Sequence, residues 1–275
     1  MIRRLTLLLF PFLFLACGEE PDPYAPFTIV RGDIELTVDP AVGGRIASLK
    51  FRGQELLQTV RDSANLHWGS VGWTSPQSAW DWPPPVAFDS APFTVTELRE
   101  YRYLLEGPLD TASMLRMRKR VAIGPDDEIG LTYWVTNEGG DDVSVALWEN
   151  TRLPYAGRIE FGRDSLRHWK DVLEPALVRD SVYVLHLDDR YAGKAGKIFT
   201  TLNDGYADYY LDGVRLRKES LVRDYYRVAP GQAPLELFAS EPDGFVEFEL
   251  QGDYRTLGPG ESNNLRLRWS LSAGE

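Results

Sequence analysis

Two glutamates near the carboxyl end of the chain, Glu247 and Glu249, lie in a stretch that alternates apolar and acidic residues, 245–250. Successive side chains of a β-strand point to opposite faces, so both carboxylates share one face of this predicted strand. The opposite face is apolar and comprises Val246, Phe248 and Leu250. Carboxylates placed side by side in this way can accept hydrogen bonds from the hydroxyl groups of a ligand.

A second alternating stretch, 143–153, carries Trp148, Asn150 and Arg152 on one face. Arginines alternate in the same way in 114–123 and 265–271. These strands predict a broad polar sheet face of Glu, Arg, Asn and Trp, the groups that hydrogen-bond to sugars and stack on them. The alternative is that each charged face is simply solvated.

Four of the eight tryptophans fall between residues 65 and 85, where alternation is lost and prolines oppose a central strand. We therefore expect a loop. Indole rings stack on the C–H faces of sugars, and neighbouring polar groups can bind the hydroxyls. The candidate ligand contacts in this segment, of which Trp73 and Trp80 are the most favoured, are His67, Trp73, Gln77, Trp80, Asp81 and Trp82. Alternatively, these rings plug one end of a β-sandwich.

The elements that must position these residues are strands, because the apolar period of the body is two rather than 3.6. Turn signals such as Asn137–Gly140 and Gly258–Gly260 separate the strands. The pattern predicts an all-β fold, an antiparallel sandwich in a single large domain. The expected strands are Phe27–Val30, Ile34–Val38, Arg45–Phe51, Phe93–Glu97, Met114–Ile123, Ile129–Thr136, Val143–Leu153, Ser181–Leu187, Leu235–Ala239, Phe245–Leu250 and Leu265–Leu271.

Composition excludes several functions. The 275-residue chain has a formal net charge of −11, which disfavours nucleic acid as a partner because such binding draws on clustered Lys and Arg. The single cysteine forms no internal disulfide and no CxxC site. Three dispersed histidines lack metal-ligand spacing, and no nucleotide-binding or hydrolase motif occurs, so we expect no metal and no cofactor. The oligomeric state is not indicated.

The N-terminus has the pattern of a lipoprotein signal. Arg3 and Arg4 precede a nearly unbroken apolar run, 5–16, which rises only about 18 Å and is too short to span about 30 Å of hydrocarbon. Leu13–Cys17 resembles a bacterial lipobox. We expect a signal peptide over 1–16, a lipidated Cys17 with a polar tether over 17–26, and a folded domain over 27–275. A plain cleaved signal or a buried hydrophobic segment are the alternatives.

Several segments of the body resemble one known superfamily. The opening hairpin, 40–57, and the closing strands, 245–271, are similar to those of the galactose-mutarotase-like (aldose 1-epimerase-like) superfamily. The tryptophan block, 73–84, is similar to a branch of it that contains bacterial lipoproteins. The resemblance covers residues 27–272 and implies a β-supersandwich with a sugar site on its concave face.

The resemblance also implies a chemistry. In mutarotases a late-strand glutamate removes the anomeric proton and a central-strand histidine protonates the ring oxygen. Glu247 matches that glutamate, with Glu249 as the fallback, and His67 resembles the substrate-binding histidine. No histidine matches the central one, since 146–150 reads Ala-Leu-Trp-Glu-Asn. Either another group, such as Glu149 or Arg152, acts as the acid, or the fold binds sugar without converting it.

We therefore expect an envelope lipoprotein, at the outer membrane, that is held to the membrane through its lipid alone. Its domain is expected to bind a saccharide, either with action on the anomeric centre as an aldose 1-epimerase-like or related carbohydrate-active enzyme or by binding alone. The alternative is a non-enzymatic envelope β-sandwich that acts as a scaffold or binds a partner. The acidic residues that follow Cys17 resemble a surface-export signal.

Overall fold

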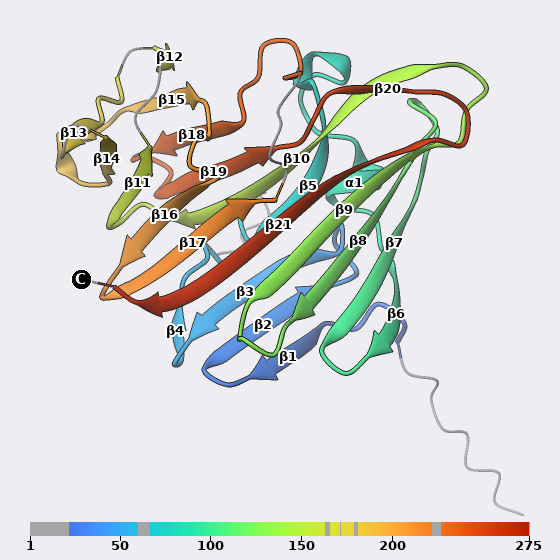
Figure 1. Ribbon diagram of the computed structural model, residues 1–275, viewed down its shortest axis with the longest axis horizontal. Coiled ribbons are helices and arrows are strands. Elements are labelled where there is room, and N and C mark those ends of the chain that lie inside the picture. The colour runs from blue at the N-terminus through green and yellow to red at the C-terminus, as the bar shows by residue number, and fades with distance from the viewer. Residues whose placement is uncertain are drawn as a thin grey trace, which may run out of the picture.

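The structure, a computed structural model, describes residues 22–59, 67–162, 166–170, 172–178, 181–221 and 227–274. The predicted signal peptide and Cys17 lie outside these residues. Two antiparallel sheets face each other, as the sequence predicted (Figure 1). In the described residues the first sheet has 11 strands: β1 (Phe27–Arg31), β2 (Ile34–Asp39), β3 (Arg45–Phe51), β4 (Gln54–Glu55), β5 (Ser70–Ser75), β10 (Val143–Pro154), β12 (Arg167–Trp169), β15 (Ala195–Thr200), β18 (Leu235–Ser240), β19 (Phe245–Gln251) and β20 (Arg255–Leu257).

The second sheet has ten strands in the same described ranges, and only short helices accompany the two sheets. No helix within the described residues is long and apolar enough to cross a membrane. The helices are η1 (Gln77–Ala79), α1 (Val86–Asp89) and η2 (Asp189–Tyr191). The ten strands are β6 (Thr94–Arg99), β7 (Arg102–Asp110), β8 (Leu115–Ile123), β9 (Ile129–Asn137), β11 (Arg158–Gly162), β13 (Ala176–Val178), β14 (Val182–His186), β16 (Tyr206–Leu211), β17 (Val214–Ser220) and β21 (Ser262–Ala273).

The apolar faces predicted from alternation form the core. Leu147 of β10, Phe248 of β19 and Leu267 of β21 are each at most 1% exposed. Trp269 of β21 is the largest fully buried side chain among the described residues. Burial of this kind is the main stabilising contribution in a chain without disulfides.

A polar cluster interrupts this core between the sheets. Glu149 of β10 and Lys218 of β17 are fully buried and form an ion pair, with Nζ 2.7 Å from Oε2. Ser70 and Thr151 donate hydrogen bonds to the other oxygen of Glu149, and Lys218 also donates to the Phe248 carbonyl at 2.6 Å. Lys218 thus fastens the second sheet to two central strands of the first, β10 and β19.

The prediction of one broad polar face is wrong, because the four strands assigned to it are divided between the two sheets. β8 and β21, which carry the alternating arginines, belong to the second sheet. Arg116 and Arg118 form partly exposed ion pairs with Glu138 and Glu106 there. Alternation alone gives the side of a strand and not the sheet to which the strand belongs, so only β10 and β19 contribute the face that was foreseen.

The predicted loop over residues 65–85 is also wrong in part. Residues 70–75 form β5, which pairs with β10 and contacts β3. Every residue of β5 is buried, so both faces are covered and no apolar–polar alternation remains in the sequence. The prolines lie after the strand, where the chain turns through η1 and α1.

Candidate functional site

Strand register brings two rows of functional side chains together on the first sheet. Side chains directly opposite on neighbouring strands share a face. Across β10, β19, β18 and β15, one row reads Arg152, Glu247, Phe238 and Lys197. The adjacent row reads Asn150, Glu249, Glu236 and Phe199. The opposite face of the first sheet carries Glu149, which contacts Lys218 of the second sheet, so the face with these two rows points away from the second sheet.

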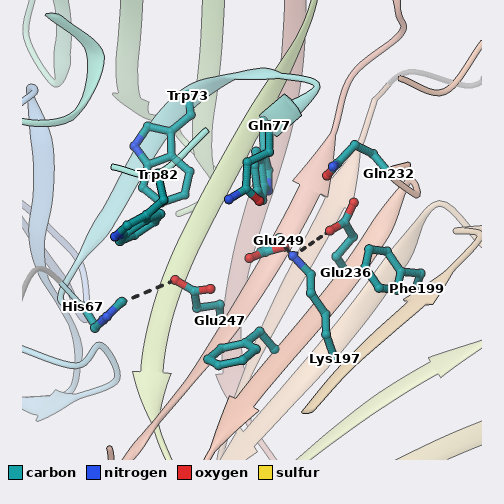
Figure 2. A pocket seen from close by; sticks show the side chains of 12 residues that line it. His67, Trp73, Gln77, Trp82, Lys197, Phe199, Gln232, Glu236, Glu247 and Glu249 are labelled. Atoms are coloured by element: carbon teal, nitrogen blue, oxygen red, sulfur yellow. Dashed lines mark ion pairs between the residues drawn. The ribbon is translucent and has the colours of Figure 1, made fainter. Parts of the chain in front are cut away.

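A cavity of ≈ 380 Å³ opens over these rows, and Figure 2 shows its side chains. Its volume is in the range of small-molecule sites. Aromatic rings, carboxylates, amides and one lysine line it. The lining residues are His67, Trp73, Gln77, Trp82, Trp148, Lys197, Phe199, Gln232, Phe238, Glu236, Glu247 and Glu249.

Lys197 joins two of the carboxylates. Its Nζ lies 2.7 Å from Oε2 of Glu236 and 2.7 Å from Oε2 of Glu249, and both glutamates are fully buried. Burial alone would lower the pKa of Lys197, but the carboxylates of Glu249, Glu236 and Glu247 raise it above its ordinary value. Lys197 therefore carries its proton at neutral pH, and its side chain keeps 15% exposure at the cavity.

Glu247 is the most accessible carboxylate of the cluster, with a side chain 12% exposed. Its Oε1 lies 2.9 Å from Nε of Arg152. The same oxygen lies 3.8 Å from Nδ1 of His67, a contact that Figure 2 shows. Burial would raise the pKa of Glu247, but the charge of Arg152, the nearby His67 and the charge of Lys197 together hold it below its usual range. Glu247 is therefore ionised.

The pKa of Glu249 is shifted in the opposite direction. Burial raises its pKa well above the ordinary value, and the carboxylates of Glu247 and Glu236 add to this increase against the opposing effect of Lys197. Asn150 donates a hydrogen bond of 3.1 Å to its Oε1. Of these two neighbouring carboxyl groups, Glu247 thus has a lowered pKa and Glu249 a raised one.

Tryptophans form one wall of the cavity. Trp73 meets Trp148 edge to face, with ring centroids 5.3 Å apart, and meets Trp82 in the same way at 6.3 Å. The indole N–H of Trp73 donates to Asp89, which also binds Arg45 at 2.9 Å. The wall is therefore fixed by a buried ion pair, whereas Trp82 is 55% exposed at its edge.

The structure places the predicted site residues in three groups. Glu247, Glu249, His67, Trp73, Gln77, Trp82 and Trp148 line the cavity. Asn150 and Arg152 lie behind it and bind Glu249 and Glu247. Trp80 and Asp81 do not line it: the Trp80 indole donates to the Thr74 carbonyl, and Asp81 is exposed at a left-handed φ of 55°. Glu149 is excluded as a site acid because it binds Lys218 inside the core.

Sequence reasoning missed five lining residues: Lys197, Phe199, Gln232, Glu236 and Phe238. A signal existed for Glu236 and Phe238, because the predicted strand Leu235–Ala239 alternates and places both on one face. Lys197 lies in a strand that the sequence analysis did not predict, β15. In the described part of the chain, no group of three or more metal-ligating side chains occurs.

The fold is shared with solved structures of galactose mutarotase-like proteins. A putative aldose 1-epimerase from Escherichia coli K12 is 15% identical, with a TM-score of 0.63 over 90% of this chain and 99% of that one. A galactose mutarotase-like protein from Lactobacillus casei is 13% identical, with a TM-score of 0.61 over 90% and 100%. An aldose epimerase homologue from C. elegans is 10% identical, with a TM-score of 0.64 over 91% and 99%.

Sequence comparison gives a separate result. No curated protein sequence matches the chain. The model of one protein family, described as "Domain of unknown function (DUF4380)", matches residues 70–272, a span that contains the cavity-lining residues apart from His67. The chain belongs to the DUF4380 family, and it has the galactose mutarotase-like fold.

Proposed function

We propose that this domain binds a saccharide in the cavity over β10, β19, β18 and β15 and interconverts its anomers. The observation that carries the proposal is the row in which ionised Glu247 and protonated Lys197 flank Phe238. Two strand spacings, about 10 Å, separate their backbones. Both side chains line the cavity of ≈ 380 Å³, a volume in the range of small-molecule sites. The fold that this chain shares with the solved structures of galactose mutarotase-like proteins supports the same class of ligand.

Glu247 and Lys197 have the protonation states that ring opening requires. Glu247 accepts the proton of the anomeric hydroxyl, whose electrons form the carbonyl as the bond from the anomeric carbon to the ring oxygen breaks. Lys197 donates a proton to that oxygen. The aldehyde rotates, and the reverse transfers close the ring with the other configuration. Lys197 thereby supplies the proton that the central-strand histidine supplies in mutarotases.

The experiment that tests the proposal follows anomer exchange by NMR on the full chain in neutral detergent micelles. A panel of aldoses is equilibrated, and exchange between the two anomeric signals is measured with and without protein. We expect faster exchange for at least one sugar and saturable binding of the same sugar. Binding without faster exchange would contradict the catalytic part alone, and absence of both would contradict the whole proposal.

Replacing Trp82 by alanine is expected to weaken saccharide binding up to about tenfold, because an aromatic contact contributes about 0.5–1.5 kcal/mol. Trp82 is 55% exposed, so its removal should leave the core intact. The measurement is a calorimetric titration. Val86→Ala serves as the control, since Val86 is 67% exposed and does not line the cavity. Equal affinity of both variants would show that Trp82 does not contact the ligand.

The proposal includes the lipid anchor predicted over residues 1–17, which places the domain at the bacterial cell envelope. Support comes from the apolar run that ends at the only cysteine, Cys17. Cys17→Ser is expected to abolish incorporation of a labelled fatty acid and to release the protein from the membrane fraction, since two or more acyl chains are what hold such a protein stably. Metabolic labelling checks this, and retained label in the variant would refute the anchor.

A further inference from the structure

We infer that the preferred ligand of the cavity is a 2-amino-2-deoxy aldose, whose ammonium group lies beside Glu247 and the tryptophan wall. The inference rests on the proposed function. An amino group on the carbon next to the anomeric centre stays close to whichever residue contacts the anomeric hydroxyl. Glu247 is the residue assigned to that hydroxyl, so one carboxylate is near both groups.

The charges of the cavity are the first observation behind this inference. Three carboxylates line it, from Glu236, Glu247 and Glu249, whereas Lys197 is the one ammonium or guanidinium group among the described residues that line it. Arg152 lies behind Glu247 and is 1% exposed. His67, 3.8 Å from Glu247, adds a positive charge only when it is protonated. The three carboxyl groups outnumber the two permanent cations, Lys197 and Arg152, and the raised pKa of Glu249 means that a proton makes up the difference. A cationic ligand can take the place of that proton.

The existing cations are already engaged by protein groups. Lys197 contacts Glu236 and Glu249, each at 2.7 Å. Arg152 donates to Glu247 and stacks over the Trp73 ring with its guanidinium carbon 4.7 Å from the centroid. A ligand phosphate or carboxylate would have to displace one of these contacts and would meet the repulsion of the remaining carboxylates. Anionic sugars are therefore disfavoured.

The aromatic wall is the second observation. Rings in this cavity already hold cations against their faces, as Arg152 does on Trp73 and Lys197 does on Trp148 at 5.0 Å. Such contacts contribute from about 0.5 to about 2 kcal/mol, and most where water is excluded. Trp82 offers a further ring near His67, with centroids 6.3 Å apart. A carboxylate beside exposed indole is a pairing that suits an ammonium group.

The uptake of a cation should release a proton. Because the carboxylates of Glu247 and Glu236 raise the pKa of Glu249, a cationic ligand near them lowers it again. The groups that face Glu249 are Glu247 on its own strand, Glu236 on β18, Lys197 on β15 and Asn150 on β10. Ligand binding is then linked to proton release from the cluster.

The test is calorimetry on the full chain in neutral detergent micelles with sugars that differ at one position. Glucose, glucosamine, N-acetylglucosamine and glucose 6-phosphate are titrated below pH 7, where an amine is protonated. We expect glucosamine to bind about tenfold more tightly than glucose, N-acetylglucosamine to lose this advantage, and the phosphate to bind most weakly. Repeating the glucosamine titration in buffers of different ionisation enthalpy should show proton release.

The outcomes separate the inference from the proposed function. Equal affinities for glucose, glucosamine and N-acetylglucosamine, or tightest binding of the phosphate, would overturn the inference and leave saccharide binding established. Failure of every sugar to bind would overturn the proposed function itself. Glu247→Gln should remove the preference for the amine over glucose in a folded protein, as checked by circular dichroism. A preference that persists in this variant would refute the placement beside Glu247.

Discussion

Replacement of Glu149 by alanine is expected to lower the free energy of unfolding by about 3–5 kcal/mol, because it leaves a buried ammonium without its counter-ion. Both partners of the pair, Glu149 and Lys218, are 0% exposed. Burial lowers the pKa of Lys218, and Glu149 opposes that effect. Denaturant unfolding at neutral pH, followed by tryptophan fluorescence, measures the loss.

A second variant shows whether the charge, rather than the packing, is responsible. Glu149→Leu combined with Lys218→Met removes both charges at similar volume and should recover most of the lost stability. The deficit of the alanine variant should also shrink as pH rises toward the ordinary pKa of lysine, because the unfolded chain then ceases to bind the extra proton. If the double variant is as unstable as Glu149→Ala, the ion pair does not explain the effect.

Replacement of Glu247 by glutamine is expected to slow anomer interconversion by about 10²–10⁴-fold, the usual contribution of a positioned general base. The amide keeps the size of the side chain and an oxygen that can accept from Arg152, so the fold should persist. Because the pKa of Glu247 lies below its usual range, the wild-type rate should hold constant on the acidic side until well below pH 4. NMR exchange across pH measures both effects.

The matched control for this prediction is Glu35→Gln. Glu35 is a glutamate of β2 whose side chain is 45% exposed, and it forms a 3.8 Å ion pair with Lys50. It lies outside the cavity, so the same change of charge should leave the rate unaltered. Equal rates for Glu247→Gln and the wild type would remove Glu247 from the reaction and return the search for a base to Glu249.

The sequence was sufficient for the parts of the site that depend on alternation within one strand. Glu247 and Glu249 share one face of β19, and Trp148, Asn150 and Arg152 share one face of β10, as the period of two required. The sandwich architecture followed in the same way from short alternating segments and turn signals. The resemblance at the two ends of the domain agrees with the fold of the solved structures.

What could not be predicted depends on contacts between distant segments. β5 is covered on both faces, so its sequence lacks the pattern of a half-buried strand. Lys197 meets Glu236 and Glu249 only because β15 pairs with β18 and β18 pairs with β19. No local pattern encodes that pairing order. The same limit explains why the arginines of β8 and β21 were assigned to a single polar face.

The contact of Lys218 with Glu149, Thr151 and the Phe248 carbonyl has a consequence for how ligand specificity could diverge among relatives. One face of β10 and β19 contacts this lysine and the other face carries the cavity. A mutation in either strand therefore affects both the packing of the two sheets and ligand binding. Change is easier at the exposed edge carried by Trp82 and around Phe199 of the flanking strand β15, a side chain that lines the cavity but takes no part in the proposed proton transfers. Altered selectivity in homologous proteins should therefore arise mainly from those two regions.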